Sequence, residues 1–208
     1  MIALWKGSSK GKQTDPKSYR ALQIGSTFLK ILVVVILNRI ANWYNSQLQD
    51  QQQGFRRGRG TADGNFILKQ IQQIRRQLNK QTYKLFVDLT AAFDHVDRGW
   101  MFQSIYQRLP KETNRKLFEL IESLYSHTTT ALQQNLTDVF EIGIGVRQGG
   151  VESPALFNLY IDYVMRVYLK RCETEKIEFT KVRYAIPSIA LTNGSQFTLG
   201  KYGCETVD

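Results

Sequence analysis

One carboxylate near the middle of the chain stands where it could hold a metal ion. Asp88 ends a short run, Tyr83 to Val87, whose side chains alternate with the two-residue period of a half-buried strand. A carboxylate at the end of a strand is a ligand that a divalent cation such as Mg²⁺ accepts. Aspartate is also a favoured N-cap residue, so Asp88 could instead cap a following helix. The spacing alone favours the cap.

The rest of the chain predicts elements that could position this carboxylate. Strands are expected at 2–5 and 19–24, on either side of a basic turn. Apolar periodicity and cap residues predict helices over 26–47, from Thr61 onward with Thr61 as the cap, and over 98–108, 113–126 and 155–171. Further strands are expected over 129–135, 139–146 and within 178–208, with a hairpin turn near 135–138. The expected fold class is α+β.

Basic residues are concentrated in the first part of the chain. Residues 1–80 hold 14 Lys or Arg against 3 Asp or Glu, a net charge of +11, and residues 81–208 hold 14 against 15, a net charge of −1. A generally basic surface would explain the total of +10 but not this segregation. A basic lobe beside a nearly neutral one suits a protein that grips a polyanion with one lobe.

Cysteine usage and hydropathy narrow the class of protein further. Cys172 and Cys204 are too few and too far apart for a zinc site or a disulfide framework, which favours a reducing, intracellular compartment. The apolar run from Ile31 to Leu37 is much shorter than the roughly 18 residues that suggest a membrane span. We therefore expect this run to fill the core and expect no membrane partner.

Three segments, in order along the chain, resemble motifs of reverse transcriptases, especially those of non-LTR retrotransposons and group II introns. The segment from Phe86 to Arg98 is similar to motif A of that family. The segment from Gln53 to Asp63 is similar to the fingers motif, usually Q-x-G-F-R-x-G-R-S-T-x-D, with Gly60 in place of Ser. The segment from Gly145 to Asp162 is similar to motif B. The resemblance extends from about Trp5 to Asp162.

The resemblance implies a right-hand polymerase fold with fingers and an incomplete palm. Residues 1–80 would form the fingers and 81–208 the palm, with part of 98–145 packed against the fingers. The palm would contain an antiparallel sheet with packed helices. No thumb is expected in this sequence.

The resemblance also implies roles for residues of motif A. Asp88 would be the catalytic carboxylate and a ligand of Mg²⁺, helped by the backbone carbonyl of Leu89, because nucleotide transfer to a primer 3′ hydroxyl uses two divalent ions. Phe93 would crowd the sugar 2′ position and favour deoxynucleotides, or it would simply belong to the core. Asp94 and Asp97 are expected to cap and pair at the start of the next helix rather than to bind metal.

Motif B and the first two strands supply the residues expected to bind the dNTP. Gln148 would contact the incoming nucleotide, and Gly149 would let the backbone approach the base pair or template closely. Arg147 would pair with a nucleic-acid phosphate. Lys6 and Arg20 resemble the Lys and Arg that grip the triphosphate in this family.

The fingers motif carries a group of arginines beside Phe55. Arg56, Arg57 and Arg59 suit phosphate contacts with an RNA template or a DNA primer, which position a duplex without reading its sequence. A solvated basic loop is an equally good interpretation of any one of them.

One motif of the family is missing. Motif C, a Tyr-x-Asp-Asp hairpin that supplies two more carboxylates, should follow a segment such as 176–208, yet the only Asp after Asp162 is Asp208. Because one carboxylate cannot hold two magnesium ions, we expect that this chain alone does not polymerise DNA. The expected function is that of a fragment of a nuclear retroelement RNA-directed DNA polymerase. A non-catalytic nucleic-acid-binding remnant and a chain too incomplete to fold stably are the alternatives.

Overall fold

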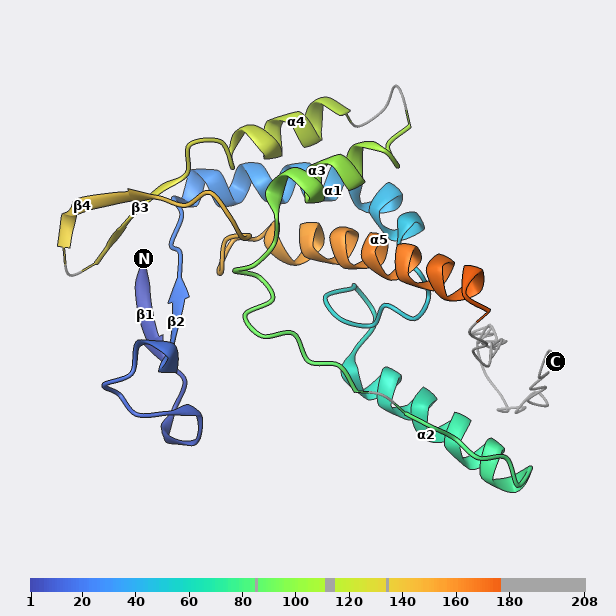
Figure 1. Ribbon diagram of the computed structural model, residues 1–208. Helices are drawn as coiled ribbons and strands as arrows, with labels where there is room; N and C mark the ends of the chain where they lie inside the picture. The colour runs from blue at the N-terminus through green and yellow to red at the C-terminus, as the bar shows by residue number, and fades with distance from the viewer. Residues whose placement is uncertain (85, 111–114, 134, 177–208) are drawn as a thin grey trace, which may run out of the picture.

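The computed structural model describes residues 1–84, 86–110, 115–133 and 135–176 (Figure 1). Within these ranges the helices are α1 (Thr27–Gln47), α2 (Thr61–Gln77), α3 (Arg98–Tyr106), α4 (Arg115–Ser123) and α5 (Ser153–Thr174). The strands are β1 (Ile2–Trp5), β2 (Tyr19–Leu22), β3 (Thr129–Leu132) and β4 (Asn135–Glu141), and short 3-10 turns cover Ser8–Lys10 and Pro16–Ser18. This mixture of helices and small antiparallel sheets agrees with the expected α+β class. The strands predicted over 178–208 lie outside the described residues.

The strands form two separate hairpins. β1 pairs antiparallel with β2, so the predicted strand, turn and strand at the start of the chain are confirmed. β3 pairs antiparallel with β4, but β4 already begins at Asn135, where the sequence predicted the turn. Ala131 pairs with Val139 but Leu132 pairs with Asn135, so the register shifts between Ala131 and Leu132 and the pairing is irregular over 136–138.

Ser26 caps the long first helix. Its Oγ accepts a hydrogen bond from the backbone N–H of Leu29 at 3.2 Å, which satisfies one of the free donors at the start of α1. The helix predicted over 26–47 is therefore confirmed.

Replacing Ser26 by alanine should lower the free energy of unfolding by about 1 kcal/mol, because the helix start loses this acceptor. Urea titration followed by circular dichroism measures the change. Ser26→Asp, which keeps an acceptor at the cap, should remain close to the wild type. Equal losses in the two variants would mean that the cap does not stabilise the chain.

Only part of the apolar surface of α1 is buried. Val33, Ile36 and Ile40 lie in the core, but Phe28 is 87% exposed and Ile31 is 58% exposed. The expectation that the whole run from 31 to 37 fills the core was therefore wrong for its outward face. With its flanking residues, α1 is also long and apolar enough to cross a membrane by length and composition, which the seven-residue run alone did not indicate. In this structure only one face of α1 packs into the core.

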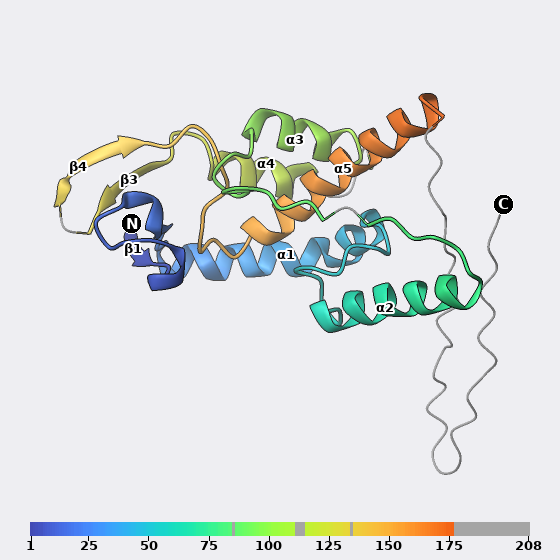
Figure 2. The same cartoon turned by 60° about the horizontal axis from the view of Figure 1, so that its bottom comes forward.

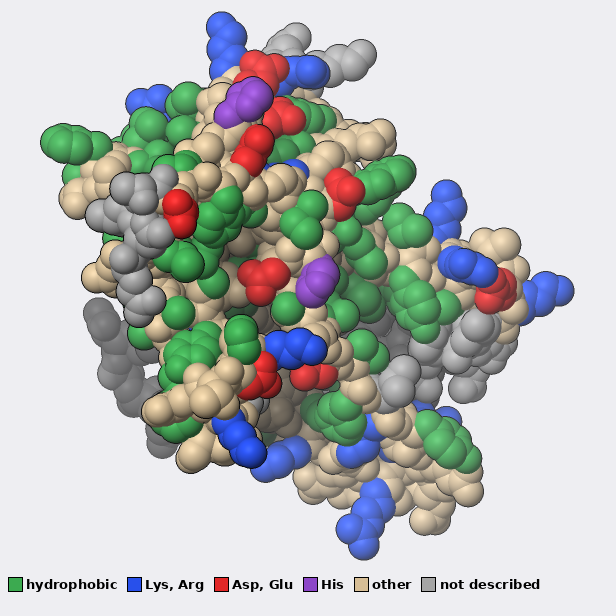
Figure 3. All heavy atoms as spheres, turned by 60° about the vertical axis from the view of Figure 1, so that its left-hand side comes forward, with side chains coloured by type: hydrophobic (Ala, Val, Ile, Leu, Met, Phe, Trp, Pro, Cys, Tyr) green, Lys and Arg blue, Asp and Glu red, His purple; other side chains and the backbone are tan. Residues whose placement is uncertain are grey.

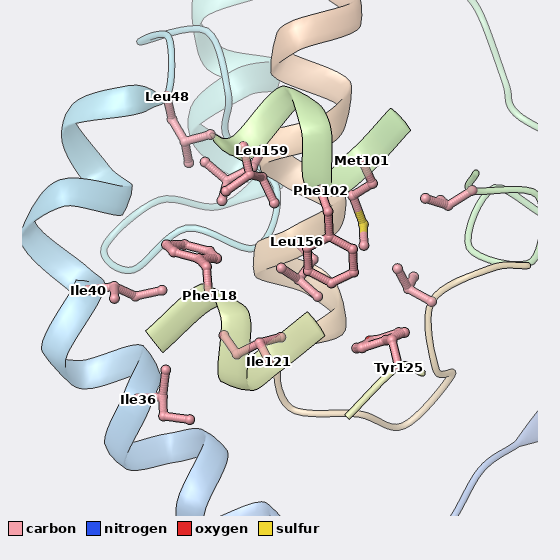
Figure 4. Packing of buried hydrophobic residues seen from close by; sticks show 13 residues of the cluster. Ile36, Ile40, Leu48, Met101, Phe102, Phe118, Ile121, Tyr125, Leu156 and Leu159 are labelled. Atoms are coloured by element: carbon pink, nitrogen blue, oxygen red, sulfur yellow. The ribbon is translucent and has the colours of Figure 1, made fainter. Parts of the chain in front are cut away.

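Four helices share one hydrophobic core (Figure 4). Its buried side chains come from α1 (Ile36, Ile40), α3 (Met101, Phe102, Ile105), α4 (Phe118, Ile121), α5 (Leu156, Leu159) and connecting segments (Leu48, Val96, Tyr125, Val146). Trp43 of α1 also meets Phe118 edge-on, with ring centroids 5.2 Å apart. Residues from both sides of position 80 contribute to this core. The core therefore does not separate fingers from palm, and the boundary predicted at residue 80 stays a prediction.

α2 lies apart from the four core helices in both ribbon views (Figures 1 and 2). Its cap is Gly60 rather than the predicted Thr61: the carboxylate of Asp63 accepts from the backbone N–H of Gly60 at 2.7 Å. Thr61 is thus the first helical residue. No side chain of α2 is fully buried, so its position depends on the segments at its two ends.

The strand predicted to end at Asp88 does not form. Residues 83, 84 and 86–88 have no regular structure, and Tyr83 and Phe86 are 90% and 78% exposed. No helix starts at Asp88 either, because turns cover 90–95 and α3 begins only at Arg98. The expected strand end and the expected helix cap at Asp88 are therefore both wrong, whereas its expected role as a metal ligand stays a prediction. The physical reason is that a strand needs a partner for its backbone groups, and no described strand pairs with this segment.

Candidate functional site

The loop between β4 and α5 joins segments that are far apart in the sequence. The backbone N–H groups of Gly145 and Val146 donate to the carbonyls of Val96 and Phe93, both at 2.8 Å. Further along the loop, the carbonyl of Gln148 accepts from the N–H of Gln23, just after β2, at 2.7 Å. The motif B loop therefore lies between the turn of motif A and the end of the first hairpin.

Two glycines permit these close approaches. Gly145 has a φ of +80°, and a Cβ added there would lie 2.8 Å from the carbonyl oxygen of Asp94 and 2.9 Å from that of Phe93. Gly149 has a φ of +101°, and its Cβ would lie 3.0 Å from the carbonyl oxygen of Gln23. Both positions need glycine because of the left-handed backbone and the nearby carbonyl. In this structure Gly149 approaches the backbone of the chain itself, just after β2.

Replacing Gly145 by alanine should cost about 2–3 kcal/mol of unfolding free energy, because it combines backbone strain with overlap against a rigid backbone. Gly143→Ala is the matched control: it lies two residues away, and a Cβ there meets nothing within 4 Å. Chemical unfolding of both variants measures the difference. Similar stabilities would contradict the tight fit of the loop against residues 93–94.

The side chains of Gln148 and Asp94 connect the motif B loop to the motif A turn. The amide Nε2 of Gln148 donates to the carboxylate Oδ1 of Asp94 at 2.7 Å. Asp94 therefore does not cap α3; that role belongs to Asp97, whose side chain accepts from the N–H of Trp100 at 2.8 Å. The expectation of a cap is confirmed for Asp97 and wrong for Asp94.

Arg147 is buried in an ion pair. Its Nε donates to Oε1 of Glu152 at 2.9 Å, and its guanidinium lies 4.6 Å from the centre of the Tyr125 ring. The Tyr125 hydroxyl also donates to Glu152 at 3.1 Å. Burial, with the charge of Glu152 as a second cause, raises the pKa of Tyr125, which keeps this donor protonated. These contacts hold Arg147 inside the protein, which favours a structural role over the expected phosphate contact.

Glu152 explains why Arg147 can be buried. Its side chain is 3% exposed, and its charge compensates the guanidinium that would otherwise be desolvated without a partner. Glu152 lies within the motif B segment, and the sequence alone indicated no role for it.

Asp88 and Leu89 stand in the exposed segment before the motif A turn, with Leu89 51% exposed. Phe93 is half-buried, and its ring centroid lies 4.9 Å from that of Phe157 and 6.1 Å from that of Phe55. Phe93 thus belongs to an aromatic row at the edge of the core. This placement is compatible with either role expected for it, because the side chain is only partly buried.

Within the described part of the chain, the donor set around Asp88 does not make a two-metal site. Among the described residues there is no group of three His, Cys, Asp or Glu side chains that could hold a metal ion. Asp88 and the Leu89 carbonyl are fewer ligands than two divalent ions require.

Lys6 and Arg20 lie on the first hairpin. The backbone N–H of Lys6 donates to the carbonyl of Ser18 at 2.8 Å, directly beyond the strand pairs, and Arg20 lies opposite Leu4. Because side chains two residues apart on paired strands share a face, the two cations lie diagonally on one side of the hairpin. The Lys6 ammonium donates to the carbonyl of Lys17 at 2.7 Å, and Arg20 is exposed.

The three arginines of the fingers motif differ in their surroundings. Arg56 donates to the carbonyls of Asn45 and Gln49, both at 3.0 Å. Arg59 pairs with Asp50 at 3.0 Å. Arg57 is exposed and has no hydrogen-bond or ion-pair partner in the described part of the chain. Arg57 is therefore the arginine whose charge is most available to a phosphate, while Arg56 and Arg59 shape their own loop.

Two buried polar residues that the sequence did not single out tie this loop to α5. Asn158 donates to the Tyr44 hydroxyl and to the carbonyl of Gly54, both at 2.9 Å, and accepts from Gln52 at 3.0 Å. Burial raises the pKa of Tyr44. The signal that could have revealed Asn158 is its polarity within an otherwise apolar stretch of a helix.

Asp162, one turn further along α5, makes a second tie. Its Oδ1 accepts from the backbone N–H of Gln49 at 3.0 Å, and its Oδ2 lies 3.0 Å from Arg108 and 2.8 Å from Arg166. Together the two residues fix the loop after α1, which includes Gly54 at the start of the fingers motif, to the helix of motif B.

The comparisons with known proteins agree with the family resemblance seen in the sequence. Residues 9–185 match the family model described as reverse transcriptase (RNA-dependent DNA polymerase). The chain is 30% identical over 155 residues to a Retrovirus-related Pol polyprotein from type-1 retrotransposable element R2 of Nasonia vitripennis, covering 73% of this chain and 14% of that protein. It is 27% identical over 157 residues to the corresponding type-2 element R2DM polyprotein of Drosophila melanogaster, covering 73% of this chain and 14% of that protein.

A third relative comes from another element. The chain is 25% identical over 175 residues to a putative 115 kDa protein in type-1 retrotransposable element R1DM of Drosophila melanogaster, covering 83% of this chain and 16% of that protein. The chain therefore spans only about a seventh of the length of the curated relatives that it matches. It belongs to the reverse transcriptase (RNA-dependent DNA polymerase) family, among the domains of non-LTR retrotransposon polyproteins.

Proposed function

We propose that these residues form the fingers and part of the palm of a retroelement RNA-directed DNA polymerase. In the longer polyprotein the domain would add dNTPs to the 3′ hydroxyl of a DNA primer on an RNA template, using Mg²⁺, and would act in the nucleus. The observation that carries the proposal is the motif B loop, which joins the motif A turn to the first hairpin through Gln148. A binding site for template, primer and nucleotide needs residues from these same segments.

Within this proposal each group has a distinct task. Gln148 and Phe93 would border the nucleotide, with Gly149 keeping the backbone close, and Lys6 and Arg20 would hold the triphosphate from one face of the hairpin. Arg57 would contact a backbone phosphate of the nucleic acid.

Asp88 would supply one carboxylate to the metal site, with the Leu89 carbonyl beside it. We propose that the remaining ligands come from parts of the polyprotein beyond the described residues, since a single carboxylate cannot organise two ions. On this reading the 208-residue chain binds nucleic acid but does not extend a primer.

A non-catalytic nucleic-acid-binding remnant is the alternative, and the net charge of +11 on residues 1–80 favours it, because this charge suits a polyanion without any metal site. In that case the basic first part of the chain would still bind RNA, with an affinity that falls steeply as salt rises.

Primer extension separates these two functions. The longer polyprotein and the 208-residue chain are each incubated with an RNA template, a labelled DNA primer, dNTPs and Mg²⁺. We expect extension by the polyprotein only, and RNA binding by both. Omission of the template or addition of EDTA should abolish extension. RNA binding by the polyprotein without extension would support the binding remnant instead.

A further inference from the structure

A basic pocket of about 400 Å³ lies at the C-terminal end of α2. It is lined by Gln72, Arg76, Asn79, Lys80, Gln81, Thr82 and Lys84. Three of these residues carry a positive charge and none is acidic. Both ribbon views place this end of α2 far from β1 and β2, so the pocket is separate from the part of the candidate site on the first hairpin (Figures 1 and 2).

The pocket exists because the chain reverses direction after α2. The N–H of Lys80 donates to the carbonyl of Arg75 at 2.9 Å, and the N–H of Asn79 donates to that of Arg76 at 3.0 Å. Asn79 has a φ of +53°. These are the features of a Schellman motif, in which a left-handed residue ends the helix. The residues that follow therefore run back beside the helix, and Lys84 reaches the same pocket as Gln72.

Arg75 holds the returning segment in place. Its Nε donates to Oγ1 of Thr82 at 2.9 Å, and its Nη2 donates to the carbonyl of Gln81. Arg75 thus ties residues 81 and 82 to the end of α2. The cations that line the pocket are the neighbouring Arg76, Lys80 and Lys84. All three are exposed, and none forms an ion pair within the described residues.

The charge of this region has no internal compensation. From residue 64 to residue 87 the sequence contains five Lys or Arg and no Asp or Glu. Basic residues at a helix C-terminus interact favourably with the helix dipole, which accounts for Arg75 and Arg76. The dipole does not account for Lys84, which lies beyond the last turn of α2. It also does not explain why three cations line one pocket.

We propose that this pocket binds the phosphates of a single-stranded segment of RNA, outside the template-primer site. Arg76, Lys80 and Lys84 would contact the phosphates, and the side-chain amides of Gln72 and Asn79 would donate hydrogen bonds to them.

A single strand is favoured over a duplex because Tyr83, 90% exposed beside these cations, offers a ring on which an unpaired base can stack. The Tyr83 hydroxyl donates to Oε1 of Gln81 at 2.9 Å, which ties the ring to the rim of the pocket. The inference adds a second contact to the proposed function and does not depend on polymerase activity.

Fluorescence anisotropy with a short labelled oligouridine, measured over a series of salt concentrations, tests the proposal. The triple variant R76Q/K80Q/K84Q should bind at least tenfold more weakly at low salt. The slope of log K against log salt should fall in magnitude by about 2, since each phosphate contact to a single strand contributes about 0.7.

The matched control removes the same charge elsewhere. K116Q/K170Q/K176Q changes three exposed lysines that do not line the pocket, and its binding should stay within about twofold of the wild type. Equal loss in the two triple variants would show that only net charge matters and would overturn the site.

A second comparison tests whether the contacts of Arg75 with residues 81 and 82 support binding. Arg75→Gln should weaken binding more than Lys69→Gln, which removes the same charge from the exposed side of α2. Equal effects would mean that the fold of the returning segment does not contribute.

Photocrosslinking of oligouridine to the wild-type chain needs no variant. It therefore tests whether RNA binds at the pocket even if a variant fails to fold. Crosslinked peptides should include residues 76–84; their absence, with crosslinks elsewhere, would overturn the proposal. A duplex of the same length or inorganic phosphate that competes as well as the single strand would contradict the preference for single-stranded RNA.

The same triple variant distinguishes this site from the proposed function. In the longer polyprotein, R76Q/K80Q/K84Q should retain primer extension at saturating template. Failure of extension in the wild-type polyprotein would count against the proposed function and leave the pocket unaffected.

Discussion

Asp88→Asn in the longer polyprotein is expected to reduce primer extension by roughly a thousandfold or more while RNA binding stays unchanged. A metal-bound carboxylate site contributes several kcal/mol to stabilisation of the transition state, and each 1.4 kcal/mol corresponds to tenfold in rate. Asn keeps the shape of Asp but loses its charge. Because Asp88 is exposed in this structure, the substitution should not destabilise the fold. Single-turnover extension rates and RNA anisotropy give the two readouts.

The control for this variant is Glu119→Gln, which removes one carboxylate from an exposed pair with Arg115 on α4. Exposed pairs of this kind contribute little to stability, so extension should be close to the wild type. If Asp88→Asn extended a primer as fast as this control, Asp88 would not be a metal ligand.

Asp162→Ala should lower the free energy of unfolding by about 3–5 kcal/mol, because it leaves a buried cation without its partner. The Asp162 side chain is 1% exposed and that of Arg108 is 14% exposed. Burial already lowers the pKa of Arg108, and the charge of Asp162 opposes this shift, so the pair depends on the carboxylate. The variant also leaves the backbone N–H of Gln49 without its acceptor. Urea unfolding measures the loss.

Two further variants serve as comparisons for Asp162→Ala. Asp162→Asn keeps an oxygen acceptor for Gln49 but not the charge, so it should fall between alanine and the wild type. Glu175→Ala, which breaks an exposed pair with Arg171, should cost less than about 1 kcal/mol. A small effect of Asp162→Ala would mean that the loop after α1 is not held by α5.

The elements with strong local signals could be predicted from the sequence. The Ser26 cap, the periodicity of α1 and α5 and the first hairpin depend on neighbouring residues, and the structure agrees with them. The interpretation of 83–88 as a strand failed because a strand depends on a partner, which alternation of side chains cannot reveal.

The candidate site shows the same limit. Motif resemblance identified motif A and motif B, which meet at the loop of residues 145–152, but it did not identify the hydrogen-bond partner of each side chain. The burial of Arg147 depends on Glu152 and Tyr125, and Tyr125 comes from a part of the chain outside the three motifs. Likewise, the spacing of Arg56 and Arg59 suggested phosphates, whereas backbone carbonyls and Asp50 lie within their reach. Sequence spacing predicts residue types near a site and does not predict long-range pairing.

The ties from Asn158 and Asp162 have a consequence for synthesis of the protein on the ribosome. The acceptor for the backbone N–H of Gln49 lies 113 residues later in the chain. At translation rates of about 5–20 residues per second, that acceptor emerges roughly ten seconds after its donor. During this interval α1 has left the exit tunnel while α3, α4 and α5, which cover its apolar side, are still being made. Nascent chains of this protein are therefore expected to bind chaperones until α5 emerges.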